Sequence, residues 1–245
     1  MSIIVENIHK TFGTHHVLRG IDFEFKHHEL NMILGGSGGG KTVLLKTMVG
    51  LLRPDKGRVL YDGQDFWALD VRAQRALRTQ IGMLFQGSAL FDSMTVGENV
   101  AFPLQMLTNT PKGEITDRVA YCLERVNLPG KGHLFPSELS GGMKKRVGIA
   151  RAIALQPKYL FCDEPNSGLD PQTAKVIDDL LVEITYAHNI TTIIISHDIN
   201  SVLNIADHIL FLYQGEKTWE GSREQLKQTD NMPLQNFLRT SGLLP

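Results

Sequence analysis

The amino-acid sequence predicts an α/β fold built around a mainly parallel sheet. Tyr159 to Cys162 and Thr191 to Ser196 are two short runs of the kind that fully buried parallel strands have. Pro171 to Tyr186, between them, has a helical pattern, and strands that alternate with helices are typical of a parallel sheet. A third apolar run, Leu30 to Leu34, leads into a glycine-rich loop and a further helical pattern that begins at Thr42.

The loop after Leu34 fits the phosphate-binding pattern of Gly, four residues, Gly-Lys-Ser/Thr without a mismatch. Its residues are Gly35, Gly36, Ser37, Gly38, Gly39, Gly40, Lys41 and Thr42. Glycines let successive N–H groups turn toward an anion, and the dipole of the following helix adds positive charge there. We expect Lys41 to reach the β- and γ-phosphates of a nucleoside triphosphate and the Thr42 hydroxyl to hold Mg²⁺. The order strand, loop, helix argues against a flexible turn, and the lack of a Gly-x-Gly-x-x-Gly register excludes a dinucleotide loop.

The composition is that of an ordinary folded chain. Of its 245 residues, 42% are hydrophobic and 21% charged, which allows one sizeable core with or without a smaller satellite. Lys and Arg number 25 against 26 Asp and Glu, a net charge of −1, so we expect no nucleic-acid partner. Cys122 and Cys162 have no metal-ligand spacing and imply no disulfide framework, which indicates a reducing compartment.

The sequence also predicts how the chain relates to membranes. No apolar run approaches the ~20 residues that span a bilayer, and Met1 to Glu6 has neither the basic nor the apolar region of a signal peptide. We therefore expect a cytoplasmic protein that reaches a membrane only through a partner.

Residues 2–26 are predicted to form β structure. Ile21 to Lys26 alternates apolar and polar residues, as a half-buried strand does. Gly13 suggests a turn, which places Phe12 on a loop, where packing is its simplest role.

Two further strands are expected at residues 58–61 and 81–85, with a polar helix at 70–79 between them. From about residue 95 to 154 the pattern becomes helical, and we interpret this stretch as an inserted helical subdomain. Its predicted helices cover residues 96–107 and 112–126, and residues 127–138 are a loop rich in proline and glycine.

An acidic pair follows the predicted strand at 159–162. Asp163 is expected to support Mg²⁺ through its water shell, and Glu164 to orient or activate an attacking water. His197 follows the strand at 191–196, although a lone histidine there more often packs or faces solvent. Because ligands bind outside the carboxyl ends of parallel strands, we expect Lys41, Asp163 and His197 to converge.

Ser140, Gly141 and Gly142 open a predicted helix in which Ser140 is a good N-cap. Two glycines inside a helix cost roughly 1 kcal/mol each against alanine, which suggests that something anionic approaches the backbone closely. A junction that merely tolerates glycine explains the pattern equally well.

At this point the chain resembles the ATP-binding-cassette (ABC) ATPase subunits over nearly its whole length. Phe12 matches the aromatic residue that stacks on adenine, Gly35 to Thr42 match the Walker A loop, and Gln86 matches the glutamine loop. Leu139 to Gly142 match the family signature, and Leu160 to Glu164 the Walker B strand. Ser167 to Asp170 match the D-loop, and His197 the switch histidine.

The resemblance implies a RecA-like P-loop NTPase core with an N-terminal antiparallel β subdomain and an inserted helical subdomain. The ATPase domain would span residues 1–222, with the helical subdomain at about 95–154 and a C-terminal extension at 223–245. It also implies a head-to-tail dimer of two copies of this chain around two ATP molecules.

The family's residue roles carry over to the matching positions. One copy would bind ATP through Phe12, Gly35 to Thr42 and Gln86. The other copy would complete that site with residues that serve the partner's ATP, namely Ser140, Gly141, Gly142 and Asp170. Mg²⁺ would be held by Thr42, Gln86 and Asp163, and Glu164, His197 and Lys41 would act in hydrolysis. The Gln86 loop would couple the site to a transmembrane permease.

Two positions depart from the family pattern: Met143 stands where most members have glutamine, and Phe12 where tyrosine is commoner. Neither change removes a phosphate contact. Met143, with Gln86 to Met94 and the tail, is similar to the ATPases of MCE-type (Mla) lipid transporters, which include systems that maintain outer-membrane lipid asymmetry. This implies phospholipid transport through a separate permease, with an MCE-type substrate-binding protein in the complex. The ATPase would then lie at the cytoplasmic face of the inner membrane, peripheral through the permease.

Other interpretations stay open. A soluble ABC ATPase of iron–sulfur assembly can be this short, whereas the DNA-maintenance type usually carries coiled-coil insertions that need sustained heptads. The Ser140 segment and the D-loop disfavour a nucleotide kinase. In the tail, Pro233 to Leu238 suggests a short helix with an apolar face, which either docks on its own domain or contacts the neighbouring subunit. We favour the second.

Overall fold

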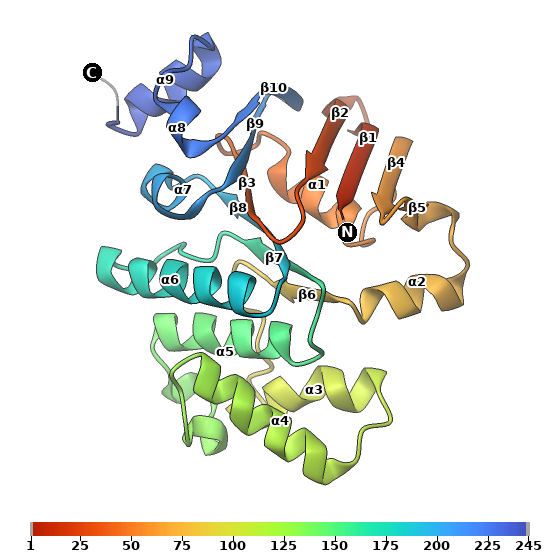
Figure 1. The fold of residues 1–245 in the computed structure, drawn as a ribbon, viewed down its shortest axis with the longest axis vertical. Helices are drawn as coiled ribbons and strands as arrows, with labels where there is room; N and C mark the ends of the chain where they lie inside the picture. The colour runs from red at the N-terminus through yellow and green to blue at the C-terminus, as the bar shows by residue number, and fades with distance from the viewer. Residues whose placement is uncertain (1, 244–245) are drawn as a thin grey trace.

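The computed structural model describes residues 2–243, which form two sheets and a set of flanking helices (Figure 1). A six-stranded sheet has the order β10-β9-β3-β8-β7-β6, and every neighbouring pair in it is parallel except β10 with β9. Its strands are β3 (Leu30–Leu34), β6 (Ile81–Leu84), β7 (Tyr159–Asp163), β8 (Thr191–Ser196), β9 (His208–Tyr213) and β10 (Glu216–Gly221). The predicted α/β class with a mainly parallel sheet is confirmed.

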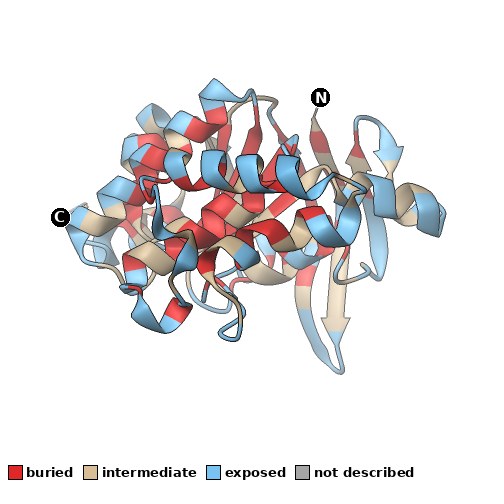
Figure 2. Ribbon diagram, turned by 90° about the horizontal axis from the view of Figure 1, so that it is seen from below, coloured by how far each residue is buried: buried red, intermediate tan, exposed pale blue. Residues whose placement is uncertain are grey.

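The central strands of this sheet are buried on both faces, as their apolar sequences predict. Every residue of β3, β7 and β8 is buried. Because side chains alternate along a strand, Phe161 and Cys162 belong to two different hydrophobic clusters, one on each face. The buried residues therefore fill the space between the sheets and helices, while the outward helix faces are exposed (Figure 2).

A four-stranded antiparallel sheet has the order β2-β1-β4-β5. Its strands are β1 (Ile3–Phe12), β2 (His15–Phe25), β4 (Lys56–Tyr61) and β5 (Gln64–Asp65). Ile21, Phe23 and Phe25 are buried while Asp22 and Glu24 are exposed, which confirms the predicted alternation. The placement of Phe12 on a loop is wrong: it is the last residue of β1 and pairs with His15, because a tight turn joins the two strands.

Helices cover the six-stranded sheet and extend beyond it. They are α1 (Lys41–Met48), α2 (Val71–Arg78), α3 (Val96–Leu107), α4 (Lys112–Arg125), α5 (Gly141–Ile153), α6 (Pro171–Ala187), α7 (Ile199–Ile205), α8 (Arg223–Leu226) and α9 (Met232–Thr240). Figure 1 shows α3, α4 and α5 together at one end of the molecule, and α8 and α9 toward the other. Within residues 127–138 only two short 3₁₀ turns occur, so the predicted loop is largely irregular.

The tail is folded against its own chain as far as it is described. Leu234 and Leu238 of α9 are fully buried, and the Phe237 ring lies 5.6 Å from the Phe211 ring of β9. The apolar face that we assigned to a neighbouring subunit is thus used within the chain, because β9 and β10 offer it a surface. Residues 244–245 of the predicted 223–245 extension lie outside the described residues. Among residues 2–243, no helix has both the length and the apolar character needed to cross a bilayer.

Candidate functional site

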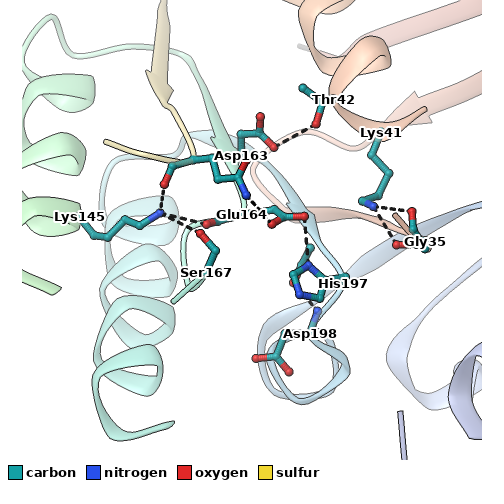
Figure 3. A network of polar contacts seen from close by, with 12 residues as sticks. Gly35, Lys41, Thr42, Lys145, Asp163, Glu164, Ser167, His197 and Asp198 are labelled. Atoms are coloured by element: carbon teal, nitrogen blue, oxygen red, sulfur yellow. Dashed lines mark hydrogen bonds and ion pairs between the residues drawn. The ribbon is translucent and has the colours of Figure 1, made fainter. Parts of the chain in front are cut away.

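Three neighbouring strands bring the predicted residues to one edge of the sheet. β3 lies beside β8 and β8 beside β7, and their carboxyl ends lead to Lys41, His197 and Asp163 respectively. The Thr42 hydroxyl lies 3.5 Å from a carboxylate oxygen of Asp163, and His197 lies 3.1 Å from Glu164 (Figure 3). The expected convergence of these side chains therefore occurs.

The glycine-rich loop wraps around the ammonium group of Lys41. Lys41 is 6% exposed, and its Nζ donates to the carbonyls of Gly35 at 2.8 Å and Gly36 at 2.9 Å. Burial lowers the pKa of Lys41, while the charges of Glu164 and Asp163 act in the opposite direction. Gly40 caps α1 with φ of 96°, and an added Cβ would lie 2.8 Å from Leu18, so the loop requires glycine there.

Thr42 and Asp163 form a small site of oxygen donors. Asp163 is 6% exposed, and its pKa is raised by burial and by the charge of Glu164, against the hydrogen bond from Thr42. Among residues 2–243, no group of three or more His, Cys, Asp or Glu side chains is placed to hold a metal ion. One hydroxyl and one carboxylate fit Mg²⁺ nevertheless, because Mg²⁺ keeps several waters and takes further oxygens from phosphates.

Glu164 is held from two sides. Its Oε2 accepts a hydrogen bond from Nε2 of Gln86 at 3.1 Å, and its Oε1 lies 3.1 Å from Nδ1 of His197. The Glu164 side chain is 19% exposed and that of His197 is 60% exposed, so water can reach the pair. A carboxylate that is held by hydrogen bonds and is accessible to solvent is suited to activate a water molecule.

A cavity of about 720 Å³ opens over the glycine-rich loop. Its lining includes Gln86, Glu164 and His197 as well as the loop itself. The sequence does not predict five further lining residues: His15 and Val17 on β2, Val43 on α1, Phe237 on α9, and Ser241 directly after α9. Phe12 is 49% exposed, and its ring lies 5.6 Å from the Lys10 ammonium. It stands apart from the residues that line this cavity.

The residues expected to serve a partner's ATP lie outside this cavity lining. Ser140 caps α5 by accepting from the Met143 N–H at 3.3 Å, as predicted. Gly142 faces α6 so closely that an added Cβ would collide with the Thr173 methyl group, so packing within the chain explains this glycine. Asp170 caps α6, and the Thr173 hydroxyl, 2.6 Å away, holds the pKa of Asp170 below its ordinary value.

Two buried polar residues near the site are not predicted from the sequence. Lys145 of α5 donates to the backbone carbonyl of Glu164 and to the Ser167 hydroxyl. Asp178 of α6 accepts from Asn166 at 2.7 Å and from the Ser201 hydroxyl at 2.8 Å. Lys145 lies three residues after Gly142 and therefore on the same, buried face of α5. A lysine at this helical spacing predicts a buried charge, which the sequence alone could have indicated.

Residues 18–167 match the family model described as ABC transporter. This range holds the glycine-rich loop, Gln86, the Ser140 segment and the Asp163-Glu164 pair. The chain belongs to the ABC transporter family. As an ABC ATPase it binds and hydrolyses ATP.

Curated relatives match this ABC ATPase over its full length. It is 40% identical to an intermembrane phospholipid transport system ATP-binding protein, MlaF, of Haemophilus influenzae, over 97% of this chain and 90% of that protein. It is 37% identical to a probable ribonucleotide transport ATP-binding protein, mkl, of Mycobacterium leprae, over 100% of this chain and 71% of the relative.

A solved structure has the same fold. It is a dimeric ATP-binding cassette in a post-hydrolysis state, bound to ADP and Pi. The TM-score is 0.83 at 30% identity, over 90% of this ABC ATPase and 98% of that chain.

Proposed function

We propose that this ABC ATPase drives the movement of a lipid, and specifically of a phospholipid, through a separate membrane permease. The observation that carries the proposal is the similarity to MlaF over nearly the whole of both chains. Met143 after the signature and the segment from Gln86 to Met94 support it further.

In the proposed hydrolytic step, Glu164 takes a proton from the attacking water while Gln86 and His197 keep its carboxylate in place. Lys41 exchanges the carbonyls of Gly35 and Gly36 for β- and γ-phosphate oxygens, which offer its ammonium a stronger, charge-assisted partner. Thr42, Asp163 and the amide oxygen of Gln86 are the proposed donors to Mg²⁺ or its waters. Mg²⁺ would supply neutralisation of phosphate charge.

The proposed site is shared by two copies of the chain. The residues proposed to serve the partner's ATP lie apart from those around the chain's own glycine-rich loop, namely Ser140, Gly141, Gly142 and Asp170. The dimeric form of the similar solved structure supports this arrangement. Phe12 is proposed to stack on adenine, which its exposure allows.

The proposed permease contact is an apolar groove beside Gln86. It has a volume of about 400 Å³, and its lining includes Met83, Phe85, Phe91 and Leu107. Phe85 is 37% exposed, Phe91 41% and Leu107 40%, which is unusual for side chains of this size. Arg151 donates to the carbonyls of Ser88 at 2.6 Å and Ala89 at 2.7 Å, so the loop between Gln86 and the groove is held in place. We propose that a short amphipathic helix of the permease occupies this groove.

This contact would place the chain at the cytoplasmic face of the inner membrane, with an MCE-type substrate-binding protein in the same complex. The alternative is a soluble ATPase of iron–sulfur assembly or DNA maintenance. A solvent-facing apolar groove next to the catalytic residues favours a membrane partner over the DNA-maintenance type. The longest helix among residues 2–243, α6, has 17 residues, too short for a coiled-coil arm.

The experiment is purification of the tagged chain from its native membranes, followed by identification of its partners. The proposal expects a multispan permease and an MCE-type protein, and ATP-dependent phospholipid transfer when the complex is reconstituted in vesicles. A Lys41→Ala complex serves as the inactive control. Recovery of cytosolic scaffold proteins alone would favour the soluble alternative, and a reconstituted complex that moved no lipid would contradict lipid transport.

A further inference from the structure

Lys145 is a buried cation that lies among three segments of the catalytic site. The residue is 5% exposed. Its ammonium donates to the backbone carbonyls of Gln86 and Glu164, the second at 3.2 Å, and to the Ser167 hydroxyl at 3.3 Å (Figure 3). All three acceptors are neutral oxygens, so the Glu164 carboxylate remains available to Gln86 and His197.

The acceptors come from parts of the chain that are distant in sequence. Gln86 follows β6, Glu164 directly follows β7, and Ser167 lies within the loop that joins β7 to α6. Lys145 itself lies in the first half of α5, the helix that Ser140 caps. The Lys145 side chain therefore connects α5, the helix that Ser140 caps, to the backbone of Gln86 and of Glu164. The side chains of Gln86 and Glu164 are hydrogen-bonded to each other in the site.

The backbone of Glu164 is strained, and Lys145 is one of the contacts that hold it. Glu164 has φ of 49°, a left-handed conformation that costs free energy in a residue with a side chain. Its N–H donates to the Ile195 carbonyl at 3.0 Å, and its own carbonyl accepts from Lys145 at 3.2 Å. Such strain persists only where the surroundings fix the residue on several sides.

We propose that Lys145 is a positioning residue for ATP hydrolysis, which keeps Glu164 and Gln86 in register with each other and with helix α5. The inference rests on the role proposed above for Glu164 in activating water. Lys145 lies outside the cavity that the glycine-rich loop lines, so its loss should affect the chemical step and leave ATP binding intact. The ammonium is bound by backbone carbonyls, whose desolvation is costly when the donor is removed.

The test compares three forms of the full-length ATPase in steady-state kinetics. For Lys145→Met, we expect kcat to fall about tenfold or more while KM for ATP changes less than about twofold. Lys145→Arg keeps a charged donor and should recover kcat to at least about threefold above Lys145→Met. Lys175→Met is the matched control, because Lys175 is an exposed lysine on α6 whose ion pair within residues 2–243 is with Asp179 at the surface.

A kcat of Lys145→Met within about twofold of the wild type would overturn the proposal, as would equal effects on kcat and on ATP binding. If Lys145→Met did not fold, Lys145→Gln would be judged by the same split between kcat and KM. A parallel Glu164→Gln variant separates the two proposals. Full activity of Glu164→Gln would reject the role of Glu164, whereas an inactive Glu164→Gln beside an unimpaired Lys145→Met would reject the role of Lys145 alone.

Discussion

Nδ1 of His197 lies 3.1 Å from Oε1 of Glu164, although the two residues are 33 positions apart in the chain. They meet because β7 and β8 are parallel neighbours, with Asp163, the last residue of β7, paired to Ile195, one residue before the end of β8. The sheet register thus sets the distance between Glu164 and His197. A shift of one residue in that register would turn one of the side chains to the other face of the sheet.

Glu164→Gln should stop turnover while ATP binding persists. The amide keeps the shape of the side chain but cannot accept the proton of the attacking water, so we expect kcat to fall by roughly 10²–10⁴. Nucleotide-bound dimers should accumulate, which size-exclusion chromatography with ATP measures. Hydrolysis at the wild-type rate would remove Glu164 from this role.

Mixing two inactive variants tests whether the ATP site is shared. In a head-to-tail dimer, one Lys41→Ala copy and one Ser140→Arg copy place both lesions in one site and leave the other intact. We expect the mixture to regain ATPase activity that neither homodimer has, as measured by phosphate release. No gain on mixing would exclude two independent shared sites.

Gly142→Ala should destabilise the fold despite the better helix propensity of alanine. The new Cβ meets the Thr173 methyl group, whose rotamer is fixed by the hydrogen bond to Asp170, and overpacking of this kind costs about 1–3 kcal/mol. Adding Thr173→Ser removes the methyl group, keeps the hydroxyl, and should restore the melting temperature. An unchanged melting temperature in the single variant would show that α5 and α6 can move apart freely.

Asp178 should make stability depend on pH. Burial raises the pKa of Asp178 above its ordinary value of 3.8, so the folded chain binds more protons there than the unfolded chain. The contribution of Asp178 to the free energy of unfolding is therefore fully present below pH 3.8 and is lost as the pH rises through the pKa of Asp178 in the folded chain. Asp178→Asn keeps the acceptor for Asn166 and Ser201 without the charge. In urea denaturation, the free energy of unfolding of Asp178→Asn should rise relative to that of the wild type as pH rises from about 4 to 7. A difference in this free energy that did not depend on pH would contradict the prediction.

Leu238→Ala tests the docking of the tail on its own chain. Leu238 is fully buried, and deleting such a side chain costs about 2–5 kcal/mol. Met232→Ala on the same helix is the control, because Met232 is 61% exposed. The loss should be independent of protein concentration in chemical denaturation, whereas a loss that appears only with dimer formation would place the helix on the neighbouring subunit.

The parts of the site that the sequence predicts are those encoded in short patterns. The Gly35 to Thr42 loop is contiguous, and the Asp163-Glu164 pair and His197 each follow a recognisable buried strand. A single rule about parallel sheets then brings them to one edge. The sequence places Phe12 on a loop because Gly13 suggests a turn, whereas Phe12 is the last residue of β1 in the structure.

Long-range contacts account for what was missed. Phe237 reaches the cavity only because α9 packs on β9, and no local pattern near Phe237 indicates a nucleotide. Lys145 and Asp178 are charged residues on otherwise buried helix faces. The sequence shows this pattern, but it does not show which residues they bind. Gly142 has a further reason to be glycine that the sequence does not show, because the Thr173 methyl group leaves no room for a Cβ there.

The position of Phe237 and Ser241 on the cavity wall has a practical consequence for handling this ATPase. Because Ser241 lines the cavity, a fluorescent label attached at this position would lie at the wall of the cavity proposed to hold ATP. Labels meant to leave turnover undisturbed belong on the exposed face of α2, where Val71 is 82% exposed. A short probe after Ser241, by contrast, would serve as a reporter of nucleotide occupancy.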